Sequence, residues 1–521
     1  MTMKSATATL AMAGTLLGCA PDSADGAGDT DSDTSTATDG DTDTDGEEIR
    51  ALLRLGLRTR LGPLPDQDTY EALLPWRLQL LELDGDSVVE VELQPEFGVV
   101  ARADRITSAW ASSQGGRFVV SDATDVEDPY GGIEHVYDAR SSFSDASPRL
   151  VGSFDVGDSS MSLLGDHWAL LGTGDEIQPE LSLVDLRSEV DVPVEVATLA
   201  GRYRWGLLPS HRGFWYVEED GNLNLVEDPD HPAPVRLSDL PEGMQVMKEW
   251  VNANVVVFAV GDNAADDPES VWVVRRTDDN WTDPAPVPVD AAEVSFVVFP
   301  PEGPDFAVAG GEGLTLHHSS GEMQSIIGPA GYWAYSPRFS QDDDHLIAFV
   351  ETGPDSGEVL AVPSAGGEVE VLAETNVFSS RPTICEDHMV FVEESGNRFS
   401  AGLVQFGDSG PTVQRDVSQQ WITSPYGRCN EHYEHAVLFS DERLEVYVVL
   451  DGEPGRWVVE DLVPVGYPVL TPDGVVYLRG DPVLDESTTA MRWQLDGAVR
   501  TTLQEGPIFR IDDLGFLEAE N

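Results

Sequence analysis

Two short runs in this sequence combine a cysteine with a histidine three residues later, and these residue types bind zinc. They are Cys385 with His388 and Cys429 with His432, one pair lying 44 residues after the other. Four such side chains could complete a tetrahedral metal site. The two cysteines could instead form a disulfide or remain unpaired, and the choice depends on the compartment in which the chain folds.

Other candidates for chemistry fit turns better than active sites. His167, His345, His388 and His435 each stand directly before an apolar run, where polar residues commonly close a turn. GDSGP (407–411) resembles the nucleophile segment of trypsin-like proteases, but it lacks one glycine and a partner histidine. We interpret it as a tight turn. The sequence also has no H-E-x-x-H, P-loop, Rossmann or G-x-S-x-G pattern.

The N-terminus has the features of an exported chain. Lys4 precedes an apolar segment over 6–17, which is shorter than the ~20 residues of a membrane-spanning helix. The segment ends Leu16-Leu17-Gly18-Cys19, which resembles the lipobox of bacterial lipoproteins. The resemblance implies that residues 1–18 are a signal peptide and that Cys19 carries a diacylglycerol anchor. Residue 20 is Ala rather than Asp, which favours the outer membrane. An ordinary secretory signal is the alternative.

A run of low complexity follows the cysteine. Residues 20–48 contain eleven acids, no base and no large apolar side chain. Such a composition cannot bury enough apolar surface to fold, so we expect residues 19–48 to be a disordered tether. The DTDTDG stretch (41–46) matches the first half of a calcium loop, but Leu52 stands where that loop needs an acid. Loose calcium association is the alternative to a solvated spacer.

An exported location bears on the cysteine pairs. Disulfides persist in the oxidising cell envelope, and two cysteines remain there besides Cys19. We therefore favour a disulfide between Cys385 and Cys429. Zinc bound by both cysteines with His388 and His432 stays as the alternative, and we expect no other metal or cofactor.

The charge of the chain limits its partners. The 521 residues contain 94 acids and 30 bases, and the formal net charge is −64. Such a surface repels nucleic acid and anionic lipid head groups. The acids are spread along the chain, which is typical of adaptation to a salty environment, while a cationic ligand or protein partner is the functional alternative.

A repeat dominates residues 49–521. A polar turn followed by a short apolar strand recurs ten times, and no long amphipathic helix stands out. The apolar strands begin at Phe118, Trp168, Phe214, Val255, Phe306, Leu346, Met389, Ala436, Val475 and Phe516. Spacings of roughly 40–45 residues with further strands between are typical of β-propeller blades. The spacing of the cysteines would place them in neighbouring blades.

Two of the units resemble the TolB-type, WD-like propeller repeat. They are YSPRFSQDDDHLIAFV (335–350) and VLTPDGVVYLRG (469–480), in which a turn precedes an apolar strand. The resemblance implies an all-β fold, a single propeller of four-stranded blades. Because propellers usually have fewer than ten blades, we expect about eight, within a range of seven to ten. Strands within 76–95 could complete the blade begun at the C-terminus, which would close the ring.

These features favour a lipid-anchored propeller of the cell envelope that binds or scaffolds a partner and has no catalytic activity. The alternative is a propeller enzyme of the lyase, hydrolase or lactonase type, with an acidic or metal-dependent site at the central channel. Three or four acids or histidines that converge on that channel would identify the enzyme. A single sequence cannot show convergence, and a fold alone does not decide function.

Overall fold

The computed structural model of the protein describes residues 51–518, with short interruptions inside that span. The interruptions are 62–72, 85–86, 93–96, 101–108, 113–115, 124–131, 139–147, 158–160, 176–177, 188–193, 209–212, 264, 266, 278–279, 301–302, 311–312, 328–332, 341–343, 380–381, 386–387, 407–409, 416, 418–420, 430–434, 441–442, 451–452, 462–464 and 481–486. The expected signal peptide, Cys19, the tether with its DTDTDG stretch, and His432 all lie outside the described residues.

Nearly all of the described chain is β-structure. The two helical segments, η3 (Ala291–Glu293) and η4 (Asp496–Ala498), are single 3₁₀ turns. No helix in the described part has the length and apolar character needed to cross a bilayer. The all-β expectation is therefore confirmed.

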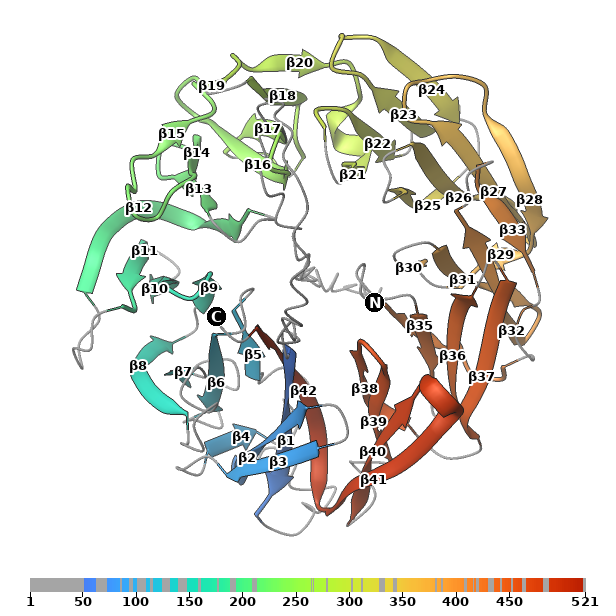
Figure 1. Cartoon of the computed structure of the whole chain (residues 1–521). Helices are drawn as coiled ribbons and strands as arrows, with labels where there is room; N and C mark the ends of the chain where they lie inside the picture. Colours follow the sequence, from blue (N-terminus) through green and yellow to red (C-terminus); the bar gives the residue numbers. More distant parts are fainter. Residues whose placement is uncertain are drawn as a thin grey trace, which may run out of the picture.

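The strands form small antiparallel sheets arranged as a ring (Figure 1). In the described part there are nine hydrogen-bonded sheets, and one of them, with seven strands, comprises two blades, so the propeller has ten blades. Ten is the number of units in the sequence repeat and the upper end of the expected range. The expected number of about eight blades was therefore too low, because every one of the ten repeat units contributes to a blade.

We number the blades along the chain from the first that is built of consecutive strands. Blade 1 contains β5 (Ala109–Ala111), β6 (Arg117–Ala123), β7 (Gly132–Asp138) and β8 (Arg149–Gly157), and blade 2 contains β9 (Met161–Leu164), β10 (Trp168–Asp175), β11 (Gln178–Asp185) and the start of β12 (Val194–Leu207). Blade 3 contains the end of β12 with β13 (Phe214–Glu218), β14 (Leu223–Val226) and β15 (Val235–Arg236), and blade 4 contains β16 (Met244–Val251), β17 (Val255–Asp262), β18 (Ser270–Thr277), β19 (Asn280–Trp281) and β20 (Ala285–Val287). Blade 5 contains β21 (Val294–Val298), β22 (Phe306–Gly310), β23 (Gly313–His317) and β24 (Met323–Ile327).

The second half of the ring continues in the same way. Blade 6 contains β25 (Trp333–Phe339), β26 (His345–Gly353), β27 (Ser356–Pro363) and β28 (Glu370–Thr375). Blade 7 contains β29 (Val377–Phe378), β30 (Thr383–Ile384), β31 (His388–Ser395), β32 (Arg398–Gln405) and β33 (Thr412–Gln414), and blade 8 contains β34 (Tyr426–Arg428), β35 (His435–Phe439), β36 (Arg443–Leu450) and β37 (Glu453–Asp461). Blade 9 contains β38 (Val465–Thr471), β39 (Gly474–Arg479), β40 (Thr488–Gln494) and β41 (Val499–Gly506).

The tenth blade joins the two ends of the chain, and we call it the closing blade. Its strand order is β3 (Ser87–Glu92), β2 (Leu73–Asp84), β1 (Ala51–Arg60) and β42 (Ile508–Glu518), and β4 (Phe97–Val100) also pairs with β2. Strands within 76–95 do contribute, as expected. The sequence repeat does not predict β1, however, and it places Phe516 on the same kind of strand as the other nine starts. Phe516 lies instead in β42, the innermost strand of its blade (Figure 1).

The core of the propeller lies between neighbouring blades. In β17, Val255, Val257 and Ala259 pack toward blade 5. The alternating residues Val256 and Phe258 pack toward blade 3. A strand buried on both faces needs apolar residues at every position, which explains the continuous apolar runs of the repeat. Each such side chain contributes roughly 1.5–3 kcal/mol relative to exposure, so the interfaces between blades hold the ring together.

Candidate functional site

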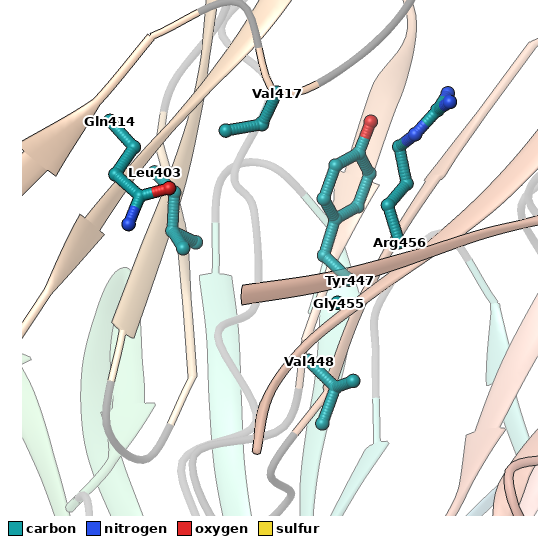
Figure 2. Close-up of a pocket in the computed structure, with 7 residues that line it drawn as sticks. All are labelled: Leu403, Gln414, Val417, Tyr447, Val448, Gly455 and Arg456. Atoms are coloured by element: carbon teal, nitrogen blue, oxygen red, sulfur yellow. The ribbon is translucent and has the colours of Figure 1, made fainter. Parts of the chain in front are cut away.

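A cavity of about 210 Å³ lies between blades 7 and 8, and its lining residues are drawn in Figure 2. One wall comes from β32, β33 and the segment after it, and the other from β36 and β37. The lining residues are Leu403, Gln414, Val417, Tyr447, Val448, Gly455 and Arg456. Leu403 and Val417 supply apolar side chains, while Gln414, Tyr447 and Arg456 supply polar groups. This mixture is typical of small-ligand sites.

A fully buried carboxylate, Glu445, is bonded to two of the lining residues, Tyr447 and Arg456. The Tyr447 hydroxyl donates a hydrogen bond to it. Arg456 Nη1 lies 3.0 Å and Arg443 Nη1 lies 3.3 Å from the same carboxylate oxygen. The Arg443 guanidinium also lies 4.7 Å from the centre of the buried Trp421 ring. Burial of a carboxylate is costly unless charges and donors compensate it, and this cluster supplies both.

Strand geometry explains how the cluster assembles. Arg443, Glu445 and Tyr447 alternate along β36, so their side chains leave the same face of the strand. Arg456 pairs with Tyr447 across the ladder and therefore shares that face. Two guanidinium groups, those of Arg443 and Arg456, therefore contact one buried carboxylate.

Blades 7 and 8 also carry the two cysteines. Their Sγ atoms are 2.09 Å apart, and the bond links residues 44 positions apart in the chain. Cys385 is fully buried within the apolar cluster that includes Trp421 and Tyr447. Sulfurs bonded to each other are not thiolates, so in this state they cannot bind zinc. In the described part of the chain, no three His, Cys, Asp or Glu side chains are grouped to hold a metal.

The four histidines do not share one role. His167 is exposed in a turn, as expected. His388 and His435 instead begin the second strands of their blades and are fully buried. His435 Nε2 lies 2.7 Å from the Gly474 carbonyl oxygen in blade 9. Burial lowers the pKa of His435, so a neutral ring that donates from Nε2 joins blade 8 to blade 9.

One acid on an innermost strand has the properties of a proton-transfer group. Glu249 in β16 lies 3.0 Å from Arg204 Nη1 on β12. Burial raises the pKa of Glu249 to about 7, and the nearby Arg204 charge opposes that rise. Neighbouring Lys248 donates to the Val294 carbonyl oxygen of the next blade. A carboxyl group with a pKa near neutrality can act as a general acid or base.

A row of serine, histidine and aspartate crosses blade 1. Ser153 Oγ lies 2.8 Å from His135 Nδ1, and Asp122 Oδ2 lies 3.5 Å from His135 Nε2. In a catalytic triad the serine contacts Nε2 and the acid contacts Nδ1, which is the reverse of this arrangement. His135 is paired directly with Ser153 on β8 and lies diagonally from Asp122 on β6, so we interpret the row as sheet pairing.

Comparison with known proteins shows similarity of fold alone. No protein-family model matches the sequence, and no curated protein matches it either. Among solved structures, prolyl endopeptidase is 12% identical with a TM-score of 0.31 over 58% of this chain, which spans about half of that protein's length (48%). A eukaryotic initiation factor is 10% identical with a TM-score of 0.46, covering 88% of this chain and 99% of its own. An oligogalacturonate lyase in complex with manganese is 12% identical with a TM-score of 0.34, covering 68% and 98%.

Of the candidate residues expected from sequence, the structure brings Cys385 together with Cys429, and the cavity beside them was not predicted. A signal was present in RLEVYVV (443–449), where Arg443, Glu445 and Tyr447 alternate with apolar residues. In a blade that is covered on both faces, such a polar row must be buried and neutralised. The partner Arg456 could be assigned only with the hairpin register in hand.

Proposed function

We propose that the protein is a TolB-like, lipid-anchored propeller of the bacterial cell envelope that binds a partner and does not itself catalyse a reaction. The bond between Cys385 and Cys429 carries the proposal. Thiols stay reduced in the cytosol, so a bonded pair that joins two blades fits an exported protein. A lipid on Cys19 would hold the propeller at the outer membrane.

The ion pairs of the propeller support a rigid binding scaffold. Buried Glu393 accepts hydrogen bonds from Arg415 at 2.8 and 3.2 Å. Glu460 of blade 8 accepts from Tyr477 and Arg500 of blade 9, at 3.0 and 2.8 Å. These two carboxylates bond to neighbouring strands and blades and so stabilise the propeller. The acids elsewhere give the chain its large negative charge, which favours a cationic protein or ligand as the partner and disfavours nucleic acid.

Photo-crosslinking in intact cells tests the binding role. We would purify the full-length protein with its crosslinked partners and compare it with a chain that keeps residues 1–48 but lacks the propeller. We expect one stoichiometric partner that is captured by the full-length protein alone. Equal capture by the two chains, or no capture, would contradict a partner-binding propeller.

The anchor is tested separately with Cys19→Ser. Metabolic labelling with an alkyne fatty acid should tag the wild-type chain in the membrane fraction, and the variant should lose both the tag and the fractionation. A variant that remains in the membrane without the tag would refute the lipid anchor. It would leave the partner result standing, because the two measurements are independent.

Glu249 favours a second candidate function, an enzyme of the lyase, hydrolase or lactonase type. Its position on an innermost strand and its raised pKa, about 7, suit a proton-transfer group near the axis of the ring. We would assay lactones, nitrophenyl esters and uronide polymers across pH. Turnover that depends on pH near neutrality and disappears in Glu249→Gln would replace the binding proposal. Turnover that is unchanged in this variant would exclude Glu249 from the reaction.

A further inference from the structure

We propose that a cavity between blades 4 and 5 binds an alkylammonium group, which is a primary amine in its charged form on a short apolar chain. The inference rests on the proposed binding of a cationic partner, and it names a site and the chemical group that the site accepts. It follows from the position of the cavity, the charge of this part of the chain, and two hydroxyl groups on one wall.

The cavity has a volume of about 160 Å³. One wall is the segment 288–294, which includes η3 and leads into blade 5, and the other wall is formed by β22, β23 and β24. A Cβ atom on Gly310 would lie 2.1 Å from the Glu293 carbonyl oxygen, so the two walls are in contact at this end. The volume is many times the roughly 15 Å³ that one water molecule needs, so the space accepts a chain of several carbons.

Strand pairing explains how blade 5 presents its wall. Val308, Thr315 and Ser325 are directly paired across β22, β23 and β24, so their side chains leave the same face of the sheet. Met323 pairs with His317, two positions along β23 from Thr315, and therefore shares that face. Val308 belongs to the core cluster between blades 4 and 5, so this face is turned toward the segment 288–294.

The charge of this part of the chain selects a cation. Residues 277–337 comprise blade 5 with the segments on either side, and they contain nine acids and no Lys or Arg. Two bases of blade 4 reach blade 5, and both contact carbonyl oxygens there. Arg275 Nε lies 3.2 Å from the Pro304 oxygen, and Lys248 Nζ lies 3.3 Å from the Val294 oxygen. Two bases do not balance nine acids, so a cationic ligand is attracted and an anion is repelled.

Two of these acids, Asp290 and Glu293, line the cavity. Both residues are exposed, which places them at its mouth. Asp290 accepts a hydrogen bond from the Ala292 amide at 3.1 Å, and the Glu293 carboxylate makes no hydrogen bond or ion pair with the described residues. The mouth therefore offers a carboxylate to a charged donor.

Thr315 and Ser325 add hydroxyl oxygens on the facing wall. Thr315 Oγ1 lies 2.9 Å from His317 Nε2. Burial lowers the pKa of His317 to about 4, so the ring is neutral near pH 7 and adds no positive charge behind the hydroxyl. A hydroxyl oxygen has two acceptor lone pairs, so Thr315 retains one for a ligand whichever group donates in this pair. An ammonium group has three donors, which match two hydroxyl oxygens and one carboxylate.

The walls favour an organic cation over a metal ion. Val294 and Val308 are almost completely buried, and Met323, which is 49% exposed, adds a flexible apolar side chain. Burial of an alkyl chain against them would add to the affinity. Calcium needs six or more oxygen ligands, whereas no three His, Cys, Asp or Glu side chains are grouped to hold a metal among the residues that the structure describes.

Ligand-observed NMR titration of the full-length protein in a non-ionic detergent tests the proposal, with pentylamine as the probe. Salt at about 0.15 M screens unspecific attraction to the acidic surface, and uptake by detergent micelles alone is subtracted. Pentan-1-ol has the chain without the charge, methylamine has the charge without the chain, and calcium chloride supplies a metal cation.

We expect saturable binding of pentylamine. It should be at least about ten-fold tighter than that of methylamine, because four more CH₂ groups are buried, and about five-fold tighter than that of pentan-1-ol. Equal affinity for either of these two compounds, tighter binding of calcium, or no binding of pentylamine would overturn the proposal.

Variants assign the binding to this cavity. Glu293→Gln should weaken pentylamine binding about three-fold or more. Glu322→Gln removes an exposed carboxylate from the turn after β23 and should leave the affinity unchanged. Ser325→Phe fills the cavity from an exposed position in the outermost strand, where an aromatic residue is well tolerated, and should abolish binding. Unchanged binding in Ser325→Phe, or equal weakening in Glu293→Gln and Glu322→Gln, would refute the site.

A further titration distinguishes the two sources of such a group. A short peptide with one lysine presents an alkylammonium group from a protein. Tighter binding of this peptide than of pentylamine would assign the cavity to a lysine of a protein partner, and the reverse would assign it to a free amine.

These outcomes are separate from those of the proposed function. Titration of the purified chain needs neither membrane nor protein partner. A failed titration would leave the crosslinking result intact, and a failed crosslinking experiment would leave the amine site intact.

Discussion

The closing blade should depend on one buried ion pair between the two ends of the chain. Arg58 in β1 is fully buried, and Asp512 in β42 is nearly so. Arg58 Nη2 lies 2.9 Å from Asp512 Oδ1, and the residues are 454 positions apart in sequence. Arg510 Nε lies 3.0 Å from the same oxygen, and the Arg58 guanidinium lies 5.0 Å from the centre of the Trp76 ring.

The substitution Asp512→Ala should loosen this blade strongly. It leaves the Arg58 charge buried without its carboxylate, and the loss of one partner of a buried pair costs about 3–5 kcal/mol. The double variant Arg58→Met with Asp512→Leu removes both charges and keeps side-chain volume. It should cost much less than Asp512→Ala alone, because an apolar pair needs no compensation.

Hydrogen exchange is the suitable assay, since ten blades need not unfold as one unit. At about 1.4 kcal/mol per factor of ten, amides of β1 and β42 should exchange roughly 140- to 4,000-fold faster in Asp512→Ala. Amides of blade 5, on the far side of the ring (Figure 1), should be nearly unaffected. Glu505→Ala removes an exposed carboxylate from the neighbouring β41 and serves as the matched control.

Two results would refute this reasoning. Unchanged protection of β1 in Asp512→Ala would mean that the apolar contacts of β1 alone hold the blade closed. Equal exchange in Asp512→Ala and in the double variant would mean that removal of Asp512 from beside the Arg58 charge has no electrostatic cost.

Three further predictions follow from the described contacts. Cys429→Ser should lower the free energy of opening of blades 7 and 8 by about 4 kcal/mol for the loop of 44 residues, measured by hydrogen exchange of their amides, and reduced wild type should behave alike. Because the pKa of Glu249 rises from 4.5 to about 7 on folding, the folded state binds more protons between these values, so stability should fall as pH rises from 4.5 to 7. Glu249→Gln should flatten that slope, and an unchanged slope would assign it to other groups. Gly402→Ala should cost about 1–3 kcal/mol, since its Cβ would lie 2.0 Å from the Phe391 ring, whereas Gly506→Ala meets nothing within 4 Å and should be neutral.

The repeat was readable from sequence because of how blades are buried. The run Val255–Val260 is apolar at every position, since its alternate residues enter two different cores. Such a run occurs in the second strand from the axis in nine of the ten blades, and the sequence repeat locates all nine of these strands correctly. The second strand of the closing blade is β1, in which Arg54, Arg58 and Arg60 interrupt the apolar pattern. Their burial depends on contacts such as that with Asp512, which no local pattern reveals.

The candidate site could be predicted less well. The spacing of Cys385 and Cys429 equals one repeat, so equivalent positions in adjacent blades were expected to meet, and the sulfurs do so. The cavity beside them depends on the register between β36 and β37 and on how blade 7 packs against blade 8. The raised pKa of Glu249 likewise reflects burial, which a sequence of mixed polarity does not disclose.

The position of β1 determines how the ring would bear mechanical load. A force on the N-terminal side of the chain reaches the described part of the fold at Ala51, the first residue of β1. Because β1 is hydrogen-bonded to β2 on one edge and to β42 on the other, a pull along the strand must shear two ladders at once. Bonds loaded in parallel share the force, whereas an edge strand would peel away bond by bond. A propeller that is held from its N-terminal side is thus attached through a strand with hydrogen-bonded neighbours on both edges.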